Sequence, residues 1–327
     1  MDTVRWGVLS TATIATRKVI PAMQGAEHVE VAAIASRDEG RARKVARELG
    51  IDRAYGTYET LLSDPEIDAV YIPLPNHLHV QWSITALEAG KHVLCEKPIG
   101  LSVAEAEKLR DAGRRHPKLK LMEAFMYRHH PQWVKAKELV DDGHIGTLKA
   151  IQSFFSYHNA DPTDIRNQAD IGGGGLMDIG CYPISVSRFL FGGEPNRVAA
   201  TIEIDPTFRT DTSGTAILEF EGGTSAFTYG TLLEPFQRVN IFGTDGRIEV
   251  VIPFNAPPDR PCSVNLQQHG EVREIKLDTA DQYQIQGELM SQAILNDTPV
   301  PTPIDDAVAN MRVIERCFAA SREGTWQ

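Results

Sequence analysis

Residues 92–98, HVLCEKP, are the stretch that decides the fold of this chain. Residues 93–95 form an apolar run, which is typical of a β-strand covered on both faces. An acid, a lysine and a proline follow at 96–98, where such a strand would leave its sheet. Ligands bind at that carboxyl edge of an open α/β sheet. The stretch therefore predicts a buried parallel strand that presents Lys97 to a ligand, with Glu96 as a charge partner. A surface turn is the alternative.

Strand and helix patterns alternate on both sides of this stretch, from residue 4 to residue 122. Such alternation predicts an α/β, doubly wound parallel sheet, and we assign residues 1–122 to this first domain. Ser102 and Glu105 have the spacing of a helix capping box. The expected strands span residues 4–9, 29–35, 53–55, 68–72, 92–95 and 118–122.

The first strand runs into a turn of small residues, from Ser10 to Ala15, before an amphipathic helix. A strand, a small-residue turn and a helix start form the dinucleotide-binding unit, in which backbone N–H groups approach a pyrophosphate. Ser10 and Ala12 stand where the GxGxxG fingerprint has glycine, and the hydroxyls of Ser10 and Thr11 add donors. We therefore predict pyrophosphate contacts from this turn. An ordinary βα turn is the alternative.

The end of the second strand predicts which dinucleotide binds. Ser36 and Arg37 follow this strand, and Arg41 lies about one helical turn further on. An NAD enzyme places an acid here for the ribose 2′-hydroxyl, whereas arginine accommodates a 2′-phosphate. We therefore predict NADP(H), with Asp38 as the N-cap of the next helix. Solvated arginines at a helix start are the alternative.

After Met122 the pattern changes to longer strands joined by turns, which predicts a second, α+β domain over residues 123–327. Hairpin signals such as Gly222-Gly223 indicate a large, mainly antiparallel sheet with helices on one face. We expect the other face to be open and to support self-association. The last helix, about 305–322, is a candidate to pack back on the first domain. Expected strands span 149–157, 197–204, 213–220, 224–231, 238–242, 247–250, 263–266 and 272–277, and expected helices span 132–142, 280–296 and 305–322.

One stretch of the second domain combines flexibility with polar groups. Residues 172–175 are four glycines, which permit close backbone approach, and a helix follows them. Asp178 and Tyr182 are four residues apart, so they share one face near the start of that helix. A carboxylate and a phenol on one face predict a polar pocket wall. The alternative is a capping aspartate and a core tyrosine.

Composition limits the classes of function. The chain has 327 residues, 42% hydrophobic and 24% charged, which suits a globular protein of two domains. Its net charge of −11 argues against nucleic acid as the main partner. The four cysteines have no CxxC spacing, and neither a signal peptide nor a membrane-length apolar run is evident, so we expect a reduced cytoplasmic protein. His77 and His79 lack clustered cysteines or carboxylates, so no metal is expected.

Together these features resemble the glucose–fructose oxidoreductase, inositol dehydrogenase and rhizopine-catabolism (Gfo/Idh/MocA) family over essentially the whole chain. The resemblance rests on residues 96–98, the loop 73–79, Tyr127-Arg128 and residues 172–182. The turn at residues 9–15 and the run at residues 178–183 look most like the branch with NADP-dependent D-xylose 1-dehydrogenase and dimeric dihydrodiol dehydrogenase. Tyr182 stands where many members have histidine, and a tyrosine there resembles the dihydrodiol, xylose and glucose–fructose branches. It implies a Rossmann domain and an open-faced sheet domain that forms a homo-oligomer, in the simplest case a dimer.

The resemblance also implies roles for individual residues. It implies a substrate pocket between the domains and agrees with a cis Lys97–Pro98 peptide, which a proline that ends a strand at a ligand-facing edge also suggests. From its residue type alone, Asn76 is expected to cap the helix that follows the loop 73–79. The implied catalytic residues are Lys97, Tyr182 and Asp178, and the implied substrate-binding residues are Arg128, Phe155, Tyr157, Asp178 and Tyr182. The implied cofactor-binding residues are Ser10, Thr11, Ala12, Ile14, Ser36, Arg37, Arg41, Pro73, Leu74, Asn76, His79, Glu96, Lys97 and Arg166.

The implied reaction is hydride transfer between a sugar or polyol carbon and nicotinamide C4. Tyr182 is assigned as general base and Lys97 as the ammonium that lowers the phenol pKa from about 10. Lys97 as the proton-transfer group is the alternative, and Asp178 either orients sugar hydroxyls or holds Lys97.

The expected activity is NADP-dependent oxidation of an aldose, D-xylose or similar, at C1 to a lactone. The enzyme alternatives are oxidation of a trans-dihydrodiol and reduction of a sugar ketone such as 1,5-anhydrofructose. An NADPH-binding sensor without turnover is the non-enzyme alternative. A glycosidase that uses Glu96 and Asp178 is a more remote one.

Overall fold

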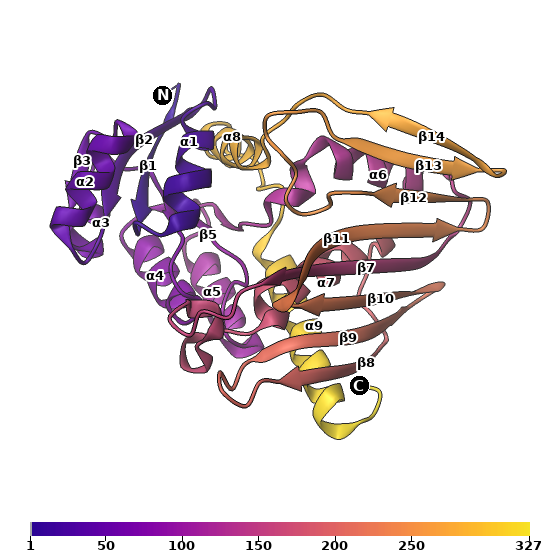
Figure 1. The fold of residues 1–327 in the computed structure, drawn as a ribbon. Coiled ribbons are helices and arrows are strands. Elements are labelled where there is room, and N and C mark those ends of the chain that lie inside the picture. The colour runs from indigo at the N-terminus through magenta and orange to yellow at the C-terminus, as the bar shows by residue number, and fades with distance from the viewer. Residues whose placement is uncertain (1) are drawn as a thin grey trace. The chain divides into compact units, whose positions relative to one another are not determined.

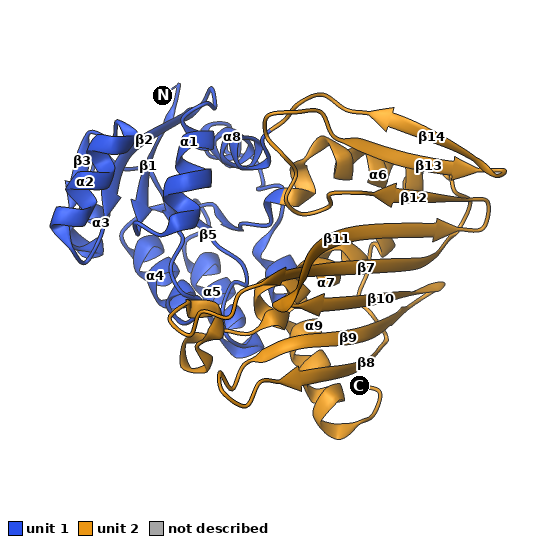
Figure 2. Ribbon diagram, viewed as in Figure 1, with its two compact units in different colours: residues 1–126, 281–308 blue, residues 127–280, 309–327 orange. Residues whose placement is uncertain are grey.

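The structure is a computed structural model that describes residues 2–327, and it divides into two compact units (Figure 1, Figure 2). Unit 1 comprises the residues up to Met126 together with Asp281–Val308, and unit 2 comprises Tyr127–Ala280 and Ala309–Gln327. The assignment of cofactor binding to residues 1–122 and substrate binding to 123–327 stays a prediction. In the described part of the chain, no helix combines the length and the apolar character that crossing a bilayer requires.

Unit 1 contains a six-stranded sheet in the order β3-β2-β1-β4-β5-β6. Every neighbouring pair is parallel, which confirms the predicted doubly wound fold. The stretch at residues 92–95 is strand β5, and its residues 93–95 are fully buried, as the apolar run predicted. The strands are β1 (Val4–Leu9), β2 (Val29–Ala35), β3 (Arg53–Tyr55), β4 (Ala69–Ile72), β5 (His92–Cys95) and β6 (Leu121–Glu123).

A helix from late in the sequence completes the core of unit 1. Helix α8 begins at Gln282, and its Ser291 Oγ accepts a 3.0 Å hydrogen bond from Trp6 Nε1 of β1. Trp6 has no exposed surface, so this bond satisfies its indole N–H inside the core. The helices of unit 1 are α1 (Ile20–Met23), α2 (Glu39–Leu49), α3 (Tyr58–Leu62), α4 (Asn76–Glu88), α5 (Val103–Arg115) and α8 (Gln282–Leu295).

Two of the three predicted helix caps are present. The Asp38 carboxylate accepts from Arg41 N at 3.1 Å, as predicted. Ser102 Oγ accepts from Glu105 N at 3.2 Å, whereas the Glu105 carboxylate accepts from the N–H of residue 101, so the box closes one residue early. The predicted Asn76 cap is wrong, because α4 begins one residue sooner and the cap position is a proline without a capping side chain.

Unit 2 contains an eight-stranded sheet in the order β14-β13-β12-β11-β7-β10-β9-β8. All neighbours are antiparallel except β7 and β10, which confirms the mainly antiparallel prediction. Strand β11 is longer than predicted, because it continues through an irregular register around Pro235. The strands are β7 (Leu148–His158), β8 (Arg197–Ile204), β9 (Asp211–Phe220), β10 (Gly223–Gly230), β11 (Leu232–Gly243), β12 (Gly246–Val250), β13 (Ser263–Gln268) and β14 (Glu271–Lys276).

Helices cover one face of this sheet, as predicted. Helix α6 (Pro131–Asp141) packs on β12 and β13, and α7 (Cys181–Phe191) packs on β7 (Figure 1). Residues 309–323 of α9 (Ile304–Glu323) belong to the same unit (Figure 2). Strand β9 alternates between buried and more exposed residues, with Leu218 buried and Ile217 40% exposed, so nothing in residues 2–327 covers the other face.

Candidate active site

The turn after β1 brings small residues to a helix start, as the dinucleotide-binding pattern requires. Ser10 Oγ accepts from Ala12 N at 3.0 Å, and Ser10 has a φ of 154°, which glycine adopts more easily than serine. Strained backbone at such a position is typical of a site built for close ligand approach. Ile14 packs against the core, and the helix continues as a π-helix over Ala15–Val19. Such π turns are frequent at functional sites.

One of the two basic residues after β2, Arg41, contacts this turn. Arg41 Nη2 donates to Thr11 O at 3.3 Å, and Asp38 N donates to Ser36 Oγ at 3.2 Å. Burial raises the pKa of the Tyr58 phenol, and the neighbouring Arg37 guanidinium opposes that effect. The Arg41 guanidinium therefore lies at the turn after β1, Arg37 lies near Tyr58, and Ser10, Thr11 and Ser36 add hydroxyl groups. This donor set fits a pyrophosphate and a ribose 2′-phosphate.

The carboxyl end of β5 is fixed by its neighbour β4. The Tyr71 hydroxyl donates to Glu96 Oε1 at 2.6 Å, and Lys97 N donates to Glu96 Oε2 at 3.3 Å. The Lys97–Pro98 peptide is cis, as predicted. Tyr71 is fully buried, and burial together with the Glu96 charge raises its pKa well above the usual phenol value. Tyr71 therefore stays a neutral donor that holds the Glu96 carboxylate at the end of β5, where the carboxylate also accepts from the Lys97 backbone N–H.

His79 joins the two predicted ligand-facing loops. Its Nδ1 lies 2.8 Å from Pro98 O and its Nε2 lies 2.7 Å from Leu74 O. Burial, aided by the Lys97 charge, lowers the His79 pKa to about 4. The ring is thus neutral at pH 7 and donates to one of these two carbonyls at a time. This places a single buried imidazole between the loop that contains Pro73 and the loop that contains Lys97, which suits a structural role.

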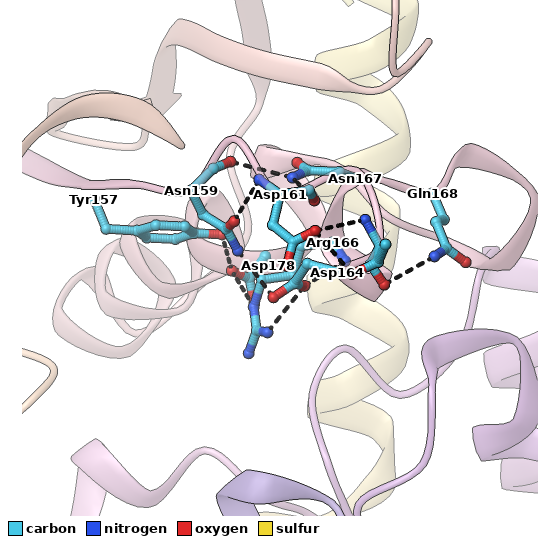
Figure 3. Close-up of polar contacts among 9 residues, drawn as sticks. Tyr157, Asn159, Asp161, Asp164, Arg166, Asn167, Gln168 and Asp178 are labelled. Carbon is cyan, nitrogen blue, oxygen red and sulfur yellow. Dashed lines mark hydrogen bonds and ion pairs between the residues drawn. The ribbon is translucent and has the colours of Figure 1, made fainter.

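A polar network in unit 2 surrounds Asp178 (Figure 3). The Tyr157 hydroxyl donates to Asp178 Oδ2 at 2.6 Å, and Arg166 Nε donates to the same oxygen at 3.1 Å. Arg166 Nη1 also donates to Asp164 Oδ1 at 3.3 Å. Burial and the Asp178 charge raise the pKa of Tyr157, so this phenol is a donor and not a base. The structure brings three predicted site residues, Tyr157, Arg166 and Asp178, into direct contact.

Tyr182 lies in an aromatic cluster at the start of α7. Its ring centroid is 5.2 Å from that of Phe254, and 5.8 Å from those of Phe155 and Tyr127. Phe254 has no exposed surface and stacks on Phe155 at 4.8 Å. Trp133 Nε1 donates to the carbonyl of residue 253 at 2.6 Å, which holds the Phe254 loop in place. Phe254 was not predicted, because it stands in an irregular segment with no motif around it.

A buried carboxylate, Asp211, holds the segment that leads to Tyr182, and the sequence did not predict it. Asp211 Oδ2 accepts from Leu176 N and from the Tyr229 hydroxyl, both at 2.6 Å. Gly174 has a φ of 126°, and a side chain there would collide with Asp211. The run from Leu176 to Gly180 is a π-helix, not the start of a regular α-helix as expected. No local signal links Asp211 to a glycine run more than thirty residues earlier in the sequence.

Two predicted site arginines have defined structural contacts. Arg128 Nε donates to Ser185 Oγ at 3.1 Å, and its guanidinium lies 5.5 Å from the Phe189 ring centroid. These contacts tie the turn before α6 to α7, so a substrate role for Arg128 stays a prediction. Arg166, predicted as a cofactor contact, belongs to unit 2 and pairs there with carboxylates. Lys97 belongs to unit 1, whereas Asp178 and Tyr182 belong to unit 2.

Comparison with known proteins identifies the family. A model described as "Oxidoreductase family, NAD-binding Rossmann fold" matches residues 4–125, and one for the GFO/IDH/MocA C-terminal domain matches residues 133–249. The chain belongs to the GFO/IDH/MocA oxidoreductase family. The predicted family and the NAD(P)-binding Rossmann fold are thereby confirmed. Within residues 2–327, no group of three or more His, Cys, Asp or Glu side chains is arranged to hold a metal ion.

Individual relatives of this GFO/IDH/MocA oxidoreductase have named activities. A D-xylose 1-dehydrogenase (NADP(+)) of Haloferax volcanii is 40% identical over 325 residues, which cover 98% of each chain. A trans-1,2-dihydrobenzene-1,2-diol dehydrogenase of Mus musculus is 34% identical over 254 residues, 76% of this chain and 74% of that one. A solved 3-ketoreductase of Actinomadura kijaniata, in complex with NADP and TDP-benzene, is 32% identical with a TM-score of 0.91, covering 97% of this chain and 98% of that one.

Proposed function

We propose that this chain is an NADP-dependent aldose 1-dehydrogenase that oxidises D-xylose or a similar neutral aldose to a lactone. The observation that carries the proposal is the 40% identity to a D-xylose 1-dehydrogenase over 98% of both chains. Relatives that match only three quarters of the chain, such as the dihydrodiol dehydrogenase, support other substrates less strongly.

The residues after β2 support NADP over NAD. Arg37 and Arg41 supply two guanidiniums where the ribose 2′-position lies in a dinucleotide-binding fold. The acid at this strand end, Asp38, already accepts a backbone N–H as the cap of α2. An NAD enzyme would instead use such a carboxylate on the ribose hydroxyls.

We propose that two residues handle the proton of the reaction. When bound, NADP⁺ supplies the hydride acceptor. Tyr182 takes the proton of the C1 hydroxyl as the C1 hydride departs, and the C1–O bond becomes the carbonyl of the lactone. The Lys97 ammonium favours the phenolate form of Tyr182 and stabilises negative charge on the substrate oxygen. Asp178 holds other substrate hydroxyls.

A second candidate function is reduction of a keto sugar with NADPH. The 3-ketoreductase fold match at a TM-score of 0.91 favours it, and the same residues serve it in the reverse direction. Tyr182 then donates the proton to the ketone oxygen. Oxidation of a trans-dihydrodiol remains the third enzyme candidate.

We also propose that the chain forms a homodimer through the uncovered face of the unit 2 sheet. Phe236 on this face is 48% exposed and packs edge-on against Phe154 at 5.7 Å, and Ile217 is 40% exposed. Exposed aromatic and branched side chains on a sheet face are typical of an interface. Light scattering on the wild type and on Phe236→Glu tests this assembly, since the variant should shift towards monomer.

The test of function is a turnover screen with both cofactors. The purified protein is assayed for NADP⁺ and NAD⁺ reduction with D-xylose, other aldoses, inositols and trans-diols, and for NADPH oxidation with keto sugars. The proposal expects the highest kcat/KM for an aldose with NADP⁺. Binding of NADPH without turnover of any of these would instead indicate a sensor.

A further inference from the structure

Arg166 is held by carboxylates at two of its three guanidinium nitrogens. Its Nε donates to Asp178 Oδ2 at 3.1 Å and its Nη1 donates to Asp164 Oδ1 at 3.3 Å. The Asp178 charge is the main cause that raises the pKa of Arg166 further, so the guanidinium is always charged. The side chain is nevertheless 43% exposed. Such double anchoring fixes the direction of an arginine that still reaches solvent.

The loop that carries Arg166 is itself held by side-chain hydrogen bonds. Asn159 Nδ2 donates to Asp164 Oδ2 at 2.9 Å, and Asn167 Nδ2 donates to Asn159 O at 3.1 Å and Asp161 O at 2.8 Å. Asp164 also accepts from Arg166 N at 2.9 Å. Three polar side chains thus organise a loop that has no strand and only short 3-10 turns.

The third guanidinium nitrogen, Nη2, points away from this network (Figure 3). For Arg166, the structure of residues 2–327 shows hydrogen bonds from the backbone N, Nε and Nη1. Nη2 therefore belongs to a guanidinium whose direction is fixed by the Asp178 and Asp164 carboxylates, and it is an oriented donor. A carboxylate can accept up to four hydrogen bonds, so Arg166 Nη2 and the Asp178 carboxylate together offer a ligand one donor and one acceptor.

The charge balance around Arg166 favours a neutral ligand over an anion. Two carboxylates contact the single guanidinium, and Asp161 lies on the same loop. A phosphate or carboxylate placed here would face more negative than positive charge. Hydroxyl groups carry no such penalty, and each hydroxyl can both donate and accept.

We propose that Arg166 and Asp178 together bind two adjacent hydroxyl groups of a neutral polyol, and that Arg166 is a specificity-determining residue for substrate and not a cofactor contact. One hydroxyl accepts from Arg166 Nη2 and its neighbour donates to the Asp178 carboxylate. Tyr157 is the positioning residue, because its hydroxyl fixes the same Asp178 oxygen that Arg166 holds. The inference rests on the proposed oxidation of an aldose.

The test compares Arg166→Gln with the wild type on an aldose and on its deoxy analogues. The inference expects Arg166→Gln to raise KM for D-xylose at least tenfold, with KM for NADP⁺ within twofold. One of 2-deoxy- and 3-deoxy-D-xylose should lack the hydroxyl that Arg166 contacts. For that sugar, Arg166→Gln should raise KM much less than it does for D-xylose. Arg260→Gln, at an exposed arginine of the same unit, is the matched control and should change neither constant.

Arg166→Lys keeps the charge and serves if the glutamine variant does not fold. The Arg166→Lys variant should still lose most of the discrimination between D-xylose and the deoxy sugars, because lysine lacks the planar guanidinium group with its several N–H donors. Equal losses on all sugars, or a raised KM for NADP⁺ alone, would overturn the inference while leaving the aldose dehydrogenase intact. A wild type that turns over no polyol with NADP⁺ would overturn the proposed function and the inference together.

Discussion

The Phe254 ring lies 5.2 Å from the Tyr182 ring and stacks on Phe155, so a single side chain about seventy residues further along the chain packs against the proposed catalytic phenol. We predict that Phe254→Leu lowers kcat by about 10- to 100-fold with little change in KM, since small displacements of a catalytic group are costly. Steady-state kinetics of the wild type and Phe254→Leu measure kcat and KM separately.

A matched control separates positioning from general destabilisation. Phe220 is buried in the same unit and stacks on Phe191 at 4.4 Å, away from Tyr182. Phe220→Leu should destabilise the fold to a similar extent, as measured by denaturant unfolding, without the loss of kcat. If both variants lose turnover equally, Phe254 is only part of the core.

Asp211 should be essential for the stability of the segment that leads to Tyr182. Tyr229→Phe removes one of the two short hydrogen bonds to Asp211 and leaves this buried carboxylate with one donor fewer. We expect a loss of about 1–3 kcal/mol in the free energy of unfolding. Urea unfolding of the wild type and the variant measures it, and an unchanged midpoint would show that water replaces the phenol at no cost.

Cofactor preference depends on the arginines after β2. We predict that Arg37→Ala raises KM for NADP⁺ more than tenfold and barely changes KM for NAD⁺, because a charge-assisted phosphate contact is worth about 1.5–3 kcal/mol. Arg43→Ala, on the same helix but paired with Glu39, is the control and should leave both constants unchanged. Parallel losses with the two cofactors would refute the 2′-phosphate assignment.

One buried and two partly buried histidines make the fold sensitive to acid. Burial lowers the pKa of His79, His92 and His129 to about 4, compared with about 6.5 in an unfolded chain. The stability from keeping them neutral is present above pH 6.5 and is lost as pH falls towards 4. Unfolding near pH 5 should take up about three protons, a slope of about 4 kcal/mol per pH unit at most. Urea midpoints between pH 7.5 and 4.5 measure this slope, and a flat profile would contradict it.

His28 should behave in the opposite sense and provides the internal contrast. Its hydrogen bond with Glu288 raises its pKa, so its stabilising effect is complete below about pH 6.5 and is lost as pH rises through the raised value. His28→Gln should therefore destabilise the protein at pH 6 more than at pH 9. Equal destabilisation at pH 6 and pH 9 would show that the charge of His28 does not contribute to stability.

The fold was predictable because most of its strands and helices leave a local pattern in the sequence. Strand β5 is apolar on both faces and is followed directly by an acid, a lysine and a proline, so residues 92–98 predicted both burial and the ligand edge. Strand β11 was underestimated, because Pro235 and its neighbours resemble a loop. The Asn76 cap failed since Pro75 can take the cap position by its backbone alone.

The site was predictable only where the sequence carries a motif. Asp178 and Tyr182 stand in one short segment, and the structure adds that Asp178 contacts Tyr157 and Arg166. The supports of that segment are not local: Asp211 reaches it from β9 and Phe254 from the loop before β13. Contacts between residues so far apart depend on sheet register, which hydrophobic pattern alone does not specify.

The central claim is that Lys97 and Tyr182 catalyse NADP-dependent oxidation of a neutral aldose. The most direct measurement is the initial rate of NADP⁺ reduction with D-xylose by the wild type, Lys97→Met and Tyr182→Phe, with NADPH binding measured alongside. The account predicts turnover by the wild type, a loss of about 10²–10⁴-fold in each variant, and NADPH affinity within a few-fold of the wild type. Wild-type turnover that survives Lys97→Met, or no turnover of any aldose with NADP⁺, would contradict it.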